Sequence, residues 1–193
     1  NRANSGGGIY NDNFGTLTAT NDTISNNRAN NSGGGIYNSN SGTLTATNDT
    51  ISNNRANNSG GGIYNSGTLT LAADLLATKG GAPSRGECGG YVTKITDLGY
   101  IVADDNTCGF PSSPAANTST SIVSTASENL GPLQNNGGPT QTILPEPGNP
   151  AIGLIPTNTR VTIVTGGPSI TLCPTTDQRG ISATGPYCNA GSV

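Results

Sequence analysis

The sequence predicts an all-β fold, a parallel β-helix or solenoid in which each coil contributes three short strands. Three observations support this prediction. The composition is polar but carries few charges, a segment of about 27 residues repeats almost unchanged in the first half of the chain, and apolar and polar residues alternate within each repeat. Alternation with period two indicates strands, and a fixed repeat of this length indicates stacked units.

The composition argues against several other classes of protein. Only 10% of the residues are charged and 31% are hydrophobic, while glycine contributes 29 of the 193 residues. So few charges are untypical of a disordered tail, and also of a helical domain whose exposed faces carry Lys and Glu. A net charge of -3 offers no basic patch for nucleic acid, so we expect no nucleic-acid partner.

Membrane insertion is not expected either. No apolar run approaches the roughly 20 residues that a membrane-spanning helix needs. No secretory signal is recognisable at the start of the sequence, so any export signal is expected to have been removed already or to lie outside it.

The repeat defines the unit of the fold. A triple glycine begins at Gly6, Gly33 and Gly60, which are equally spaced, and the segment from Gly15 to Asn30 recurs unchanged one interval later. A third, diverged copy starts at Gly67, slightly earlier than the same interval would place it. Because two residues are missing there without a change in the flanking patterns, that junction is expected to be a loop.

Each repeat contains three segments that alternate as strands do: "GIYN", "TLTAT" and "TISNN". One face of each segment is apolar and is expected to point into the solenoid. A single coil buries too few side chains to order itself, but coils stacked about 4.8 Å apart join them into continuous files. The expected inner files are Ile9, Ile36 and Ile63; Leu17, Leu44 and Leu69; Ala19, Ala46 and Leu71; and Ile24, Ile51 and Leu76.

Glycine and asparagine are expected at the corners of the coils. Glycine adopts positive φ without strain and lets two backbones approach closely. Asparagine tolerates the left-handed region, and its amide can hydrogen-bond to the same residue one coil above or below. The repetition therefore predicts a scaffold.

The chain divides at about residue 80. Residues 1–79 are predicted to form the regular repeats, and residues 80–193 an irregular continuation of the β-helix that ends in a C-terminal cap. Further strands are expected in "GYVTKITDLGYIV", "TSIVSTA", "TQTIL", "RVTIVT" and "SITL", and an exposed loop in "PSSPAANTSTS". A cap is expected because an open coil end exposes unpaired strand edges.

The four cysteines are predicted to form structural disulfides. The sequence has no CxxC pair and no histidine to complete a zinc site. Of the three possible connectivities we favour the local one, Cys88 with Cys108 and Cys173 with Cys188, each closing a loop worth about 3 kcal/mol. Disulfides imply an oxidising compartment, so the chain is expected to be secreted, periplasmic or on the cell surface.

The segments "GGGIYN", "GTLTATNDTISNN", "LGPLQNNGG", "GNPAIG", "TDQRG" and "CNAG" resemble bacterial right-handed parallel β-helix surface proteins that end in a choice-of-anchor Q domain. The repeats are also similar to those of chlamydial polymorphic outer membrane proteins. The resemblance covers nearly the whole chain and implies a surface-displayed solenoid. Its final motif departs from the family pattern by reading "CNAGSV". A right-handed path also follows from the strong preference for right-handed crossovers between parallel strands.

Two sets of charged residues align in successive repeats: Asp22, Asp49 and Asp74, and Arg2, Arg28 and Arg55. Two carboxylates one strand spacing apart would be close to the separation used by retaining glycosidases. A structural role explains the pattern better, since every repeat carries the residue and a catalytic site usually breaks a repeat. We therefore expect exposed turns with Asp-to-backbone hydrogen bonds, and no catalytic residues.

The outward faces of the "TLTAT" strands form a predicted threonine array. Such an array resembles the ice-binding faces of insect β-helical antifreeze proteins, although threonine is also ordinary on an exposed strand. A solvated or partner-binding face is the favoured interpretation. The residues of this candidate interaction face are Thr16, Thr18, Thr20, Thr43, Thr45, Thr47, Thr68 and Thr70.

Two smaller groups are candidates of other kinds. Asp104, Asp105 and Asn106 offer oxygen ligands for calcium, but they lack the spacing of a calcium loop and fit a turn before Cys108 equally well. Asp177 and Arg179 in "TDQRG" are expected to form a structural ion pair. We expect no metal site and no cofactor.

The sequence as a whole predicts an extracellular or cell-surface solenoid with a structural or adhesive role and no enzymatic activity. Its expected partners are other copies of itself, stacked head to tail into filaments, or surface proteins and polysaccharides. Two alternatives stay open: a β-helix that binds or cleaves carbohydrate, and an ice-binding protein.

Overall fold

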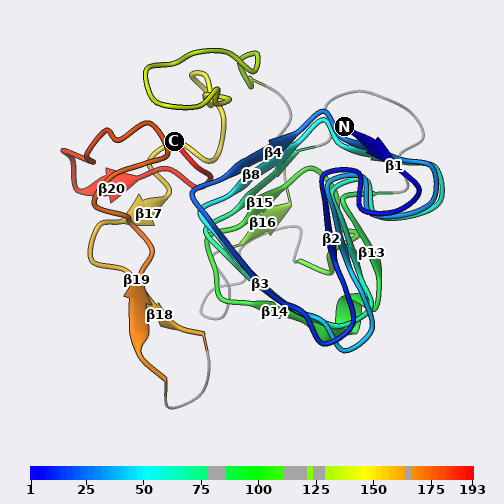
Figure 1. The fold of residues 1–193 in the computed structure, drawn as a ribbon. Helices are drawn as coiled ribbons and strands as arrows, with labels where there is room; N and C mark the ends of the chain where they lie inside the picture. Colours follow the sequence, from blue (N-terminus) through cyan, green and yellow to red (C-terminus); the bar gives the residue numbers. More distant parts are fainter. Residues whose placement is uncertain (78–85, 111–120, 124–128, 164–166) are drawn as a thin grey trace.

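A computed structural model of the chain describes residues 1–77, 86–110, 121–123, 129–163 and 167–193. Four parallel sheets form the walls of a β-solenoid, and each sheet contains one strand from each successive coil (Figure 1). In that view the chain runs clockwise from β1 to β4 and recedes with each coil, which makes the solenoid right-handed. The predicted fold class is confirmed.

Within each wall the strands follow the order of the coils. Wall A consists of β1 (Arg2–Ala3), β5 (Arg28–Ala29) and β9 (Arg55–Ala56). Wall B consists of β2 (Ile9–Asn11), β6 (Ile36–Asn38), β10 (Ile63–Asn65) and β13 (Cys88–Gly90). Wall C consists of β3 (Thr16–Thr20), β7 (Thr43–Thr47), β11 (Thr68–Ala72) and β14 (Ile95–Asp97). Wall D consists of β4 (Thr23–Ser25), β8 (Thr50–Ser52), β12 (Leu75–Ala77), β15 (Val102–Ala103) and β16 (Ile122–Val123).

Equivalent residues of successive repeats lie in register. Ile9 pairs with Ile36, and Ile36 pairs with Ile63, in parallel ladders. The three predicted strands of each repeat form walls B, C and D. Wall A is an additional ladder of two-residue strands, which are too short to show an alternating pattern in the sequence. A 3₁₀ turn, η1 (Val92–Lys94), precedes β14.

The predicted inner files form the core. Ile36, Leu44 and Ile51 are completely buried in one hydrophobic cluster that fills the inside of the solenoid. Ile9 and Leu17 of the first coil are only half-buried, because no coil covers them on the outer side.

The corners use glycine and asparagine as predicted. Gly6, Gly33 and Gly60 have φ values of 62°, 69° and 64°, and a Cβ atom at Gly34 would overlap the carbonyl oxygen of Gly61 in the next coil. Asn21 and Asn48, at the corner between walls C and D, have φ of 56°.

An asparagine ladder runs along the inside of wall B. Asn11 Nδ2 donates to Asn38 Oδ1 at 2.7 Å, and Asn38 Nδ2 donates to Asn65 Oδ1 at 2.8 Å. This bonding between equivalent amides confirms the expected role of asparagine between coils.

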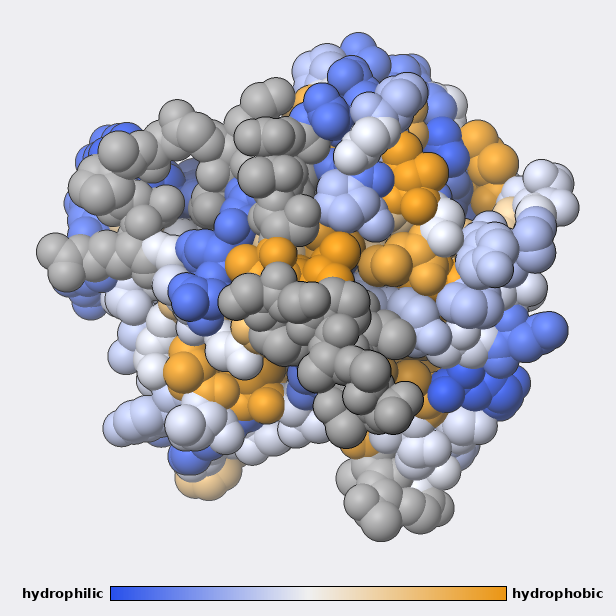
Figure 2. Space-filling view, turned by 180° about the vertical axis from the view of Figure 1, so that it is seen from behind, coloured by the Kyte–Doolittle hydropathy of each residue, from blue (hydrophilic) through white to orange (hydrophobic). Residues whose placement is uncertain are grey.

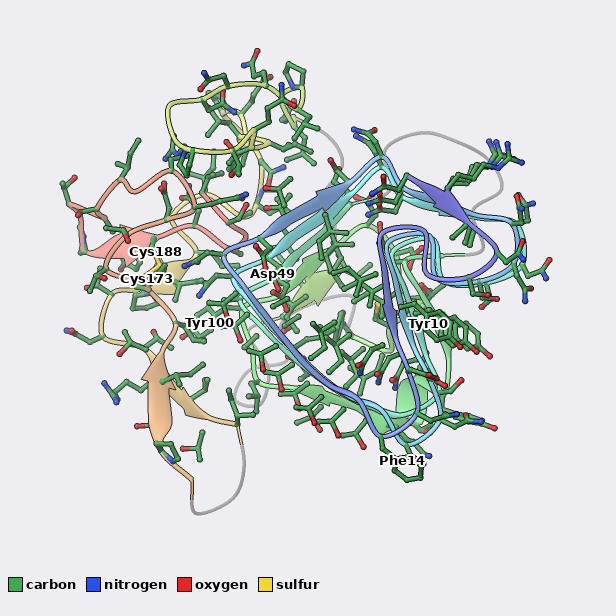
Figure 3. All side chains as sticks on the ribbon, in the orientation of Figure 1. Tyr10, Phe14, Asp49, Tyr100, Cys173 and Cys188 are labelled. Atoms are coloured by element: carbon green, nitrogen blue, oxygen red, sulfur yellow. A yellow bond between two sulfur atoms is a disulfide. The ribbon has the colours of Figure 1, made fainter. Side chains whose placement is uncertain are left out.

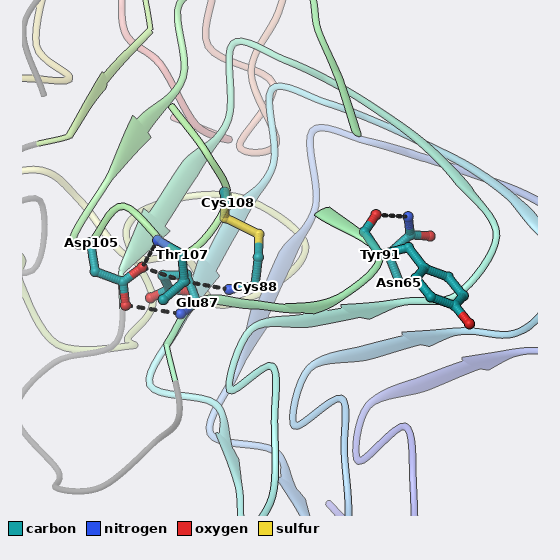
Figure 4. Close-up of a disulfide and its surroundings, with 7 residues drawn as sticks. All are labelled: Asn65, Glu87, Cys88, Tyr91, Asp105, Thr107 and Cys108. Atoms are coloured by element: carbon teal, nitrogen blue, oxygen red, sulfur yellow. Dashed lines mark hydrogen bonds between the residues drawn. A yellow bond between two sulfur atoms is a disulfide. The ribbon is translucent and has the colours of Figure 1, made fainter. Parts of the chain in front are cut away.

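The far end of the solenoid is closed by a disulfide. Cys88 continues the inner file of Ile63 and is bonded to Cys108 (Figure 4). Cys108 and Phe110 are buried in the same hydrophobic cluster as the inner files. The chain after β15 thus folds over the exposed end of the core. Figure 2, which shows the molecule from behind, has hydrophobic side chains gathered near the centre of this end.

The C-terminal section differs from the predicted cap. Parallel coils continue past residue 79 to Val123, but residues 129–163 and 167–193 lie beside the solenoid and pack against wall D (Figure 1). We call these residues the flank. Its strands pair antiparallel, β17 (Ile155–Pro156) with β20 (Tyr187–Cys188) and β18 (Arg160–Thr162) with β19 (Ser169–Thr171).

The described residues 160–162 of "RVTIVT" and 169–171 of "SITL" therefore pair as antiparallel strands outside the coils and do not form further coil strands. "TQTIL" contributes only an isolated bridge between Thr142 and Gln134. The predicted loop "PSSPAANTSTS" lies largely outside the described residues.

The flank is held to the solenoid by a second core and by hydrogen bonds. Leu75 and Ala77 point outward from wall D and pack with flank residues such as Leu130, Ile155 and Leu172 in this core. Cys173 and Cys188 form its disulfide, which confirms the local connectivity of both pairs. Because the flank contacts several coils at once, it fastens them together along the axis.

Candidate functional site

The outer surface of the coils carries the candidate sites. Wall D is covered by the flank, whereas walls A, B and C each present one type of side chain repeated from coil to coil (Figure 3). These are the arginines of wall A, the tyrosines of wall B and the threonines of wall C.

The predicted threonine array forms in register, Thr18 opposite Thr45 and Thr45 opposite Thr70. It is not uniformly exposed. Thr47 and Thr70 are buried, with exposed fractions of 4% and 8%, and Thr45 is half-buried, while Thr16, Thr18, Thr20, Thr43 and Thr68 are exposed. A flat ice-binding face would need all files open to water, so the covered threonines disfavour that alternative. The role of the array as an interaction face stays a prediction.

Wall B presents a stack of tyrosines. The rings of Tyr10, Tyr37 and Tyr64 lie 4.9 Å apart between successive centroids and are nearly parallel. The stack ends at Gly89, which takes the equivalent position in the fourth coil. The outer face of this strand had no predicted role. Its signal in the sequence was a tyrosine that follows the inner isoleucine in each of three repeats.

The stacked tyrosines present ring edges and hydroxyl groups to solvent. Tyr10, at the outer end, is 52% exposed, but both faces of Tyr37 are covered by its neighbours. An aromatic ring can stack on a ligand only where one of its faces is free. A ligand could therefore stack on this row only at its ends.

Wall A presents a row of arginines. Arg2 pairs in register with Arg28, and Arg28 with Arg55. Arg2 and Arg55 are exposed, and Arg28 is half-buried. Their side chains carry like charges and start from backbone positions about 4.8 Å apart, so neighbouring guanidinium groups repel one another.

The first arginine of this row bonds to a neutral amide. The guanidinium group of Arg2 donates to Asn30 Oδ1 from Nε and Nη2, at 3.3 and 3.1 Å. Among the residues that the structure describes, no carboxylate forms an ion pair with Arg2, Arg28 or Arg55. The ion pair that is present there joins Arg179 to Asp177 in the flank.

The aspartate file corrects one expectation. Asp22 is exposed, but Asp49 and Asp74 are completely buried and do not occupy the exposed turns predicted from the sequence. The flank covers this corner, since Gly191 N donates to the carbonyl oxygen of Ala73 at 2.8 Å. The sequence of the repeat alone could not reveal a cover that comes from a distant part of the chain.

The expected Asp-to-backbone hydrogen bonds do form. The carboxylate of Asp49 accepts from Asp22 N at 2.8 Å and from Thr47 N at 3.3 Å, and that of Asp74 accepts from Asp49 N and Ala72 N at 2.9 and 3.1 Å. Both oxygens of each carboxylate are thus used between and within coils. They hold the corner of the scaffold and offer no surface to a substrate.

Burial changes the acidity of these carboxyl groups. Loss of hydration raises the pKa of Asp74 to about 8. Loss of hydration, and then the charge of Asp74, raises the pKa of Asp49 well above its usual range. Backbone N–H donors oppose these shifts but do not overcome burial.

The two smaller candidates have structural partners. Asp105 accepts hydrogen bonds from Glu87 N at 3.1 Å and from Thr107 N at 2.9 Å (Figure 4). This favours a turn that leads to Cys108 over a calcium site. Within the described ranges, no group of three or more acidic, histidine or cysteine side chains is arranged to hold a metal ion.

Asp177 and Arg179 form the predicted ion pair, with Oδ2 and Nη2 2.6 Å apart. They line a pocket of about 250 Å³ in the flank, together with Ile181 and Tyr187. Because the two charges neutralise each other, the pocket carries no net charge from this pair.

Comparisons with family models, curated proteins and solved structures gave no significant match for this chain. The solenoid fold therefore stands on the structure itself, and the resemblance to choice-of-anchor Q and polymorphic outer membrane proteins stays a prediction. Across the described residues, no helix has the length and apolar character needed to cross a membrane.

Proposed function

We propose that this chain is a structural or adhesive β-solenoid that acts outside the cell or on its surface. The observation that carries this proposal is the way the coils are fastened: buried side-chain ladders in register, a flank across several coils and two disulfides. Such features stiffen a scaffold, and disulfides persist mainly in oxidising compartments.

The proposal includes the absence of catalysis and the membership of a bacterial surface family. It is supported by the repeated carboxylates, the strongest catalytic candidates of the sequence, because Asp49 and Asp74 are buried and bonded to backbone N–H groups. The family motifs in the sequence support a bacterial surface protein. Export can be tested by tagging the full-length protein in its native host and probing intact cells: surface labelling with oxidised cysteines supports the proposal, and a reduced cytoplasmic protein contradicts it.

Self-assembly is the finer part of the proposal. Strands β1, β2, β3 and β4 each pair on one side only, so the first coil presents an open edge in the described structure. An unpaired edge is a template for a further strand. A second copy of the chain stacked on this edge would extend the solenoid into a filament.

Negative-stain electron microscopy and light scattering over a concentration series test this part. Leu17→Lys should prevent assembly, because a second copy stacked on the first coil would bury the new charge. Thr18→Lys on the same strand points outward and is the matched control. Filaments that form equally in both variants, or monomers at all concentrations of the unmodified chain, would contradict head-to-tail stacking.

Carbohydrate binding along a lateral wall is the second candidate. The regular rows of arginine and tyrosine on walls A and B favour it over the ice-binding alternative. Binding to an array of polysaccharides, without release of shorter fragments, would support this candidate.

A further inference from the structure

The arginine row on wall A is a line of like charges with no carboxylate paired to it among the described residues. Arg2, Arg28 and Arg55 account for three of the eight basic residues in a chain of net charge -3. Parallel pairing keeps the three backbone positions one strand spacing apart on one wall, so their charges repel one another. Among the described residues, no carboxylate forms an ion pair with this row.

The surroundings of the row are polar and neutral. Each arginine is followed by at least nine residues without an acidic side chain, in the pattern "RANNSGGGIYN" or its close equivalent. Asn30 bonds to Arg2 and, at 3.4 Å, to Asn4, and Asn58 bonds to Asn31 of the coil before it. These amides link neighbouring coils and supply further hydrogen-bonding groups without adding negative charge.

We propose that the arginine row binds a linear acidic polysaccharide that lies parallel to the axis of the solenoid. Guanidinium groups bind carboxylate and sulfate oxygens through paired N–H donors. A straight row with a fixed spacing matches a polymer that carries anionic groups at regular intervals, whereas a single small anion engages only one or two of the arginines. Polymer binding also relieves the repulsion within the row.

The structure favours a polysaccharide over a nucleic acid. Proteins that bind single-stranded nucleic acid combine basic residues with aromatic faces on which the bases stack. Here the tyrosine rings stack on one another, and both faces of Tyr37 are covered. The overall charge of -3 weakens long-range attraction, but at physiological salt that effect is screened beyond about 8 Å, so the local row decides binding.

This inference rests on the proposed function as a scaffold outside the cell, with its lateral walls accessible. Dextran sulfate and uncharged dextran are matched probes, because they share a backbone and differ in charge. We expect the protein to bind dextran sulfate in calorimetry or biolayer interferometry at physiological salt, to bind dextran at least tenfold more weakly, and to lose affinity as more sodium chloride is added.

Variants identify the site. Arg28→Gln with Arg55→Gln should weaken binding at least tenfold and lower the slope of log Kd against log salt by roughly one to two. Lys94→Gln with Arg160→Gln removes the same charge elsewhere and should leave the affinity within about twofold. Arg28→Lys with Arg55→Lys keeps the charge and should retain partial binding. Thermal melts of all variants, followed by circular dichroism, report whether each one folds.

Several outcomes would overturn the inference: equal affinity for dextran and dextran sulfate, an equal loss in the two charge-removing pairs, or tighter binding of oligo-dT than of dextran sulfate. A folded protein that fails to bind polyanions but forms filaments would refute the arginine site and leave the scaffold proposal intact. A protein that binds dextran sulfate but is confined to the cytoplasm would support the arginine site and refute the proposal of a scaffold outside the cell.

Discussion

Asn38 provides the sharpest test of whether the inner asparagine ladder stabilises the fold. Its side chain is completely buried. It accepts a hydrogen bond from Asn11 and donates to Asn65 Oδ1 and to the carbonyl oxygens of Gly42 and Thr68, at distances between 2.7 and 3.2 Å. Because Nδ2 carries two hydrogens, one of its N–H groups is shared between two of these three acceptors. With the bond from Asn11, the amide makes at most three full hydrogen bonds, and its partners include the equivalent residues in both neighbouring coils.

Asn38→Ala removes all of these bonds. At a net value of about 1 kcal/mol for each full hydrogen bond, the free energy of unfolding should fall by about 3 kcal/mol. For a chain of this length that corresponds to a decrease in Tm of about 10 °C. Urea denaturation followed by circular dichroism measures the first quantity, and thermal melts measure the second.

Asn13→Ala is the matched control, because Asn13 is exposed and accepts one hydrogen bond, from Ser39. It should cost less than about 1 kcal/mol. The combined Asn11→Ala and Asn38→Ala variant should be less destabilised than the sum of the two single variants, since both remove the same 2.7 Å bond. If Asn38→Ala costs no more than Asn13→Ala, the ladder does not stabilise the fold as described.

Three further predictions concern the core, pH and the first disulfide. Leu44→Ala should cost about 2–5 kcal/mol and more than Leu17→Ala in the half-buried first coil; equal losses in urea denaturation would argue against a stacked core. Because the pKa of Asp74 is about 8 in the fold and about 3.9 in an unfolded chain, the protonated carboxyl is favoured on folding. The free energy of unfolding should therefore fall as pH rises from 4 to 8, and Asp74→Asn should flatten that slope; an identical slope in the variant would refute the assignment. Replacing Cys88 and Cys108 together by serine should cost about 3 kcal/mol, and an unchanged denaturation midpoint would show that this disulfide does not hold the far end of the coils.

The regular half of the fold could be predicted because every repeat contains the same pattern of inward-facing apolar residues. Inward isoleucine and leucine recur with the period of the coil, so one repeat predicts the position of Ile36 or Leu44 in the next. The short Arg-Ala strands of wall A escaped prediction, because two residues cannot show an alternation.

The flank could not be placed from the repeat, although the sequence contains a signal for it. Outward Thr50 and Ser52 in the second coil become Leu75 and Ala77 in the third. An apolar residue on an outward position indicates that something covers it, and here the flank does. The same cover buries Asp49 and Asp74, which explains why the expectation of exposed turns was wrong for both.

Among the candidate surfaces, the sequence revealed the threonine and arginine files because both recur at the repeat spacing. Their exposure could not be read from the pattern, since burial of Thr47 or exposure of Arg55 depends on neighbours outside the repeat. The stacking of Tyr10, Tyr37 and Tyr64 follows from the same register, but only the structure shows the rings face to face.

The most direct test of the central claim is the measurement of contacts between the methyl groups of Ile9, Ile36 and Ile63 by nuclear Overhauser effects, with single Ile→Val variants to assign the signals. The in-register solenoid predicts cross-peaks from Ile36 to both Ile9 and Ile63. Contacts of Ile36 only with residues of its own repeat, and none with the equivalent isoleucines of the neighbouring repeats, would contradict the stacking of successive coils.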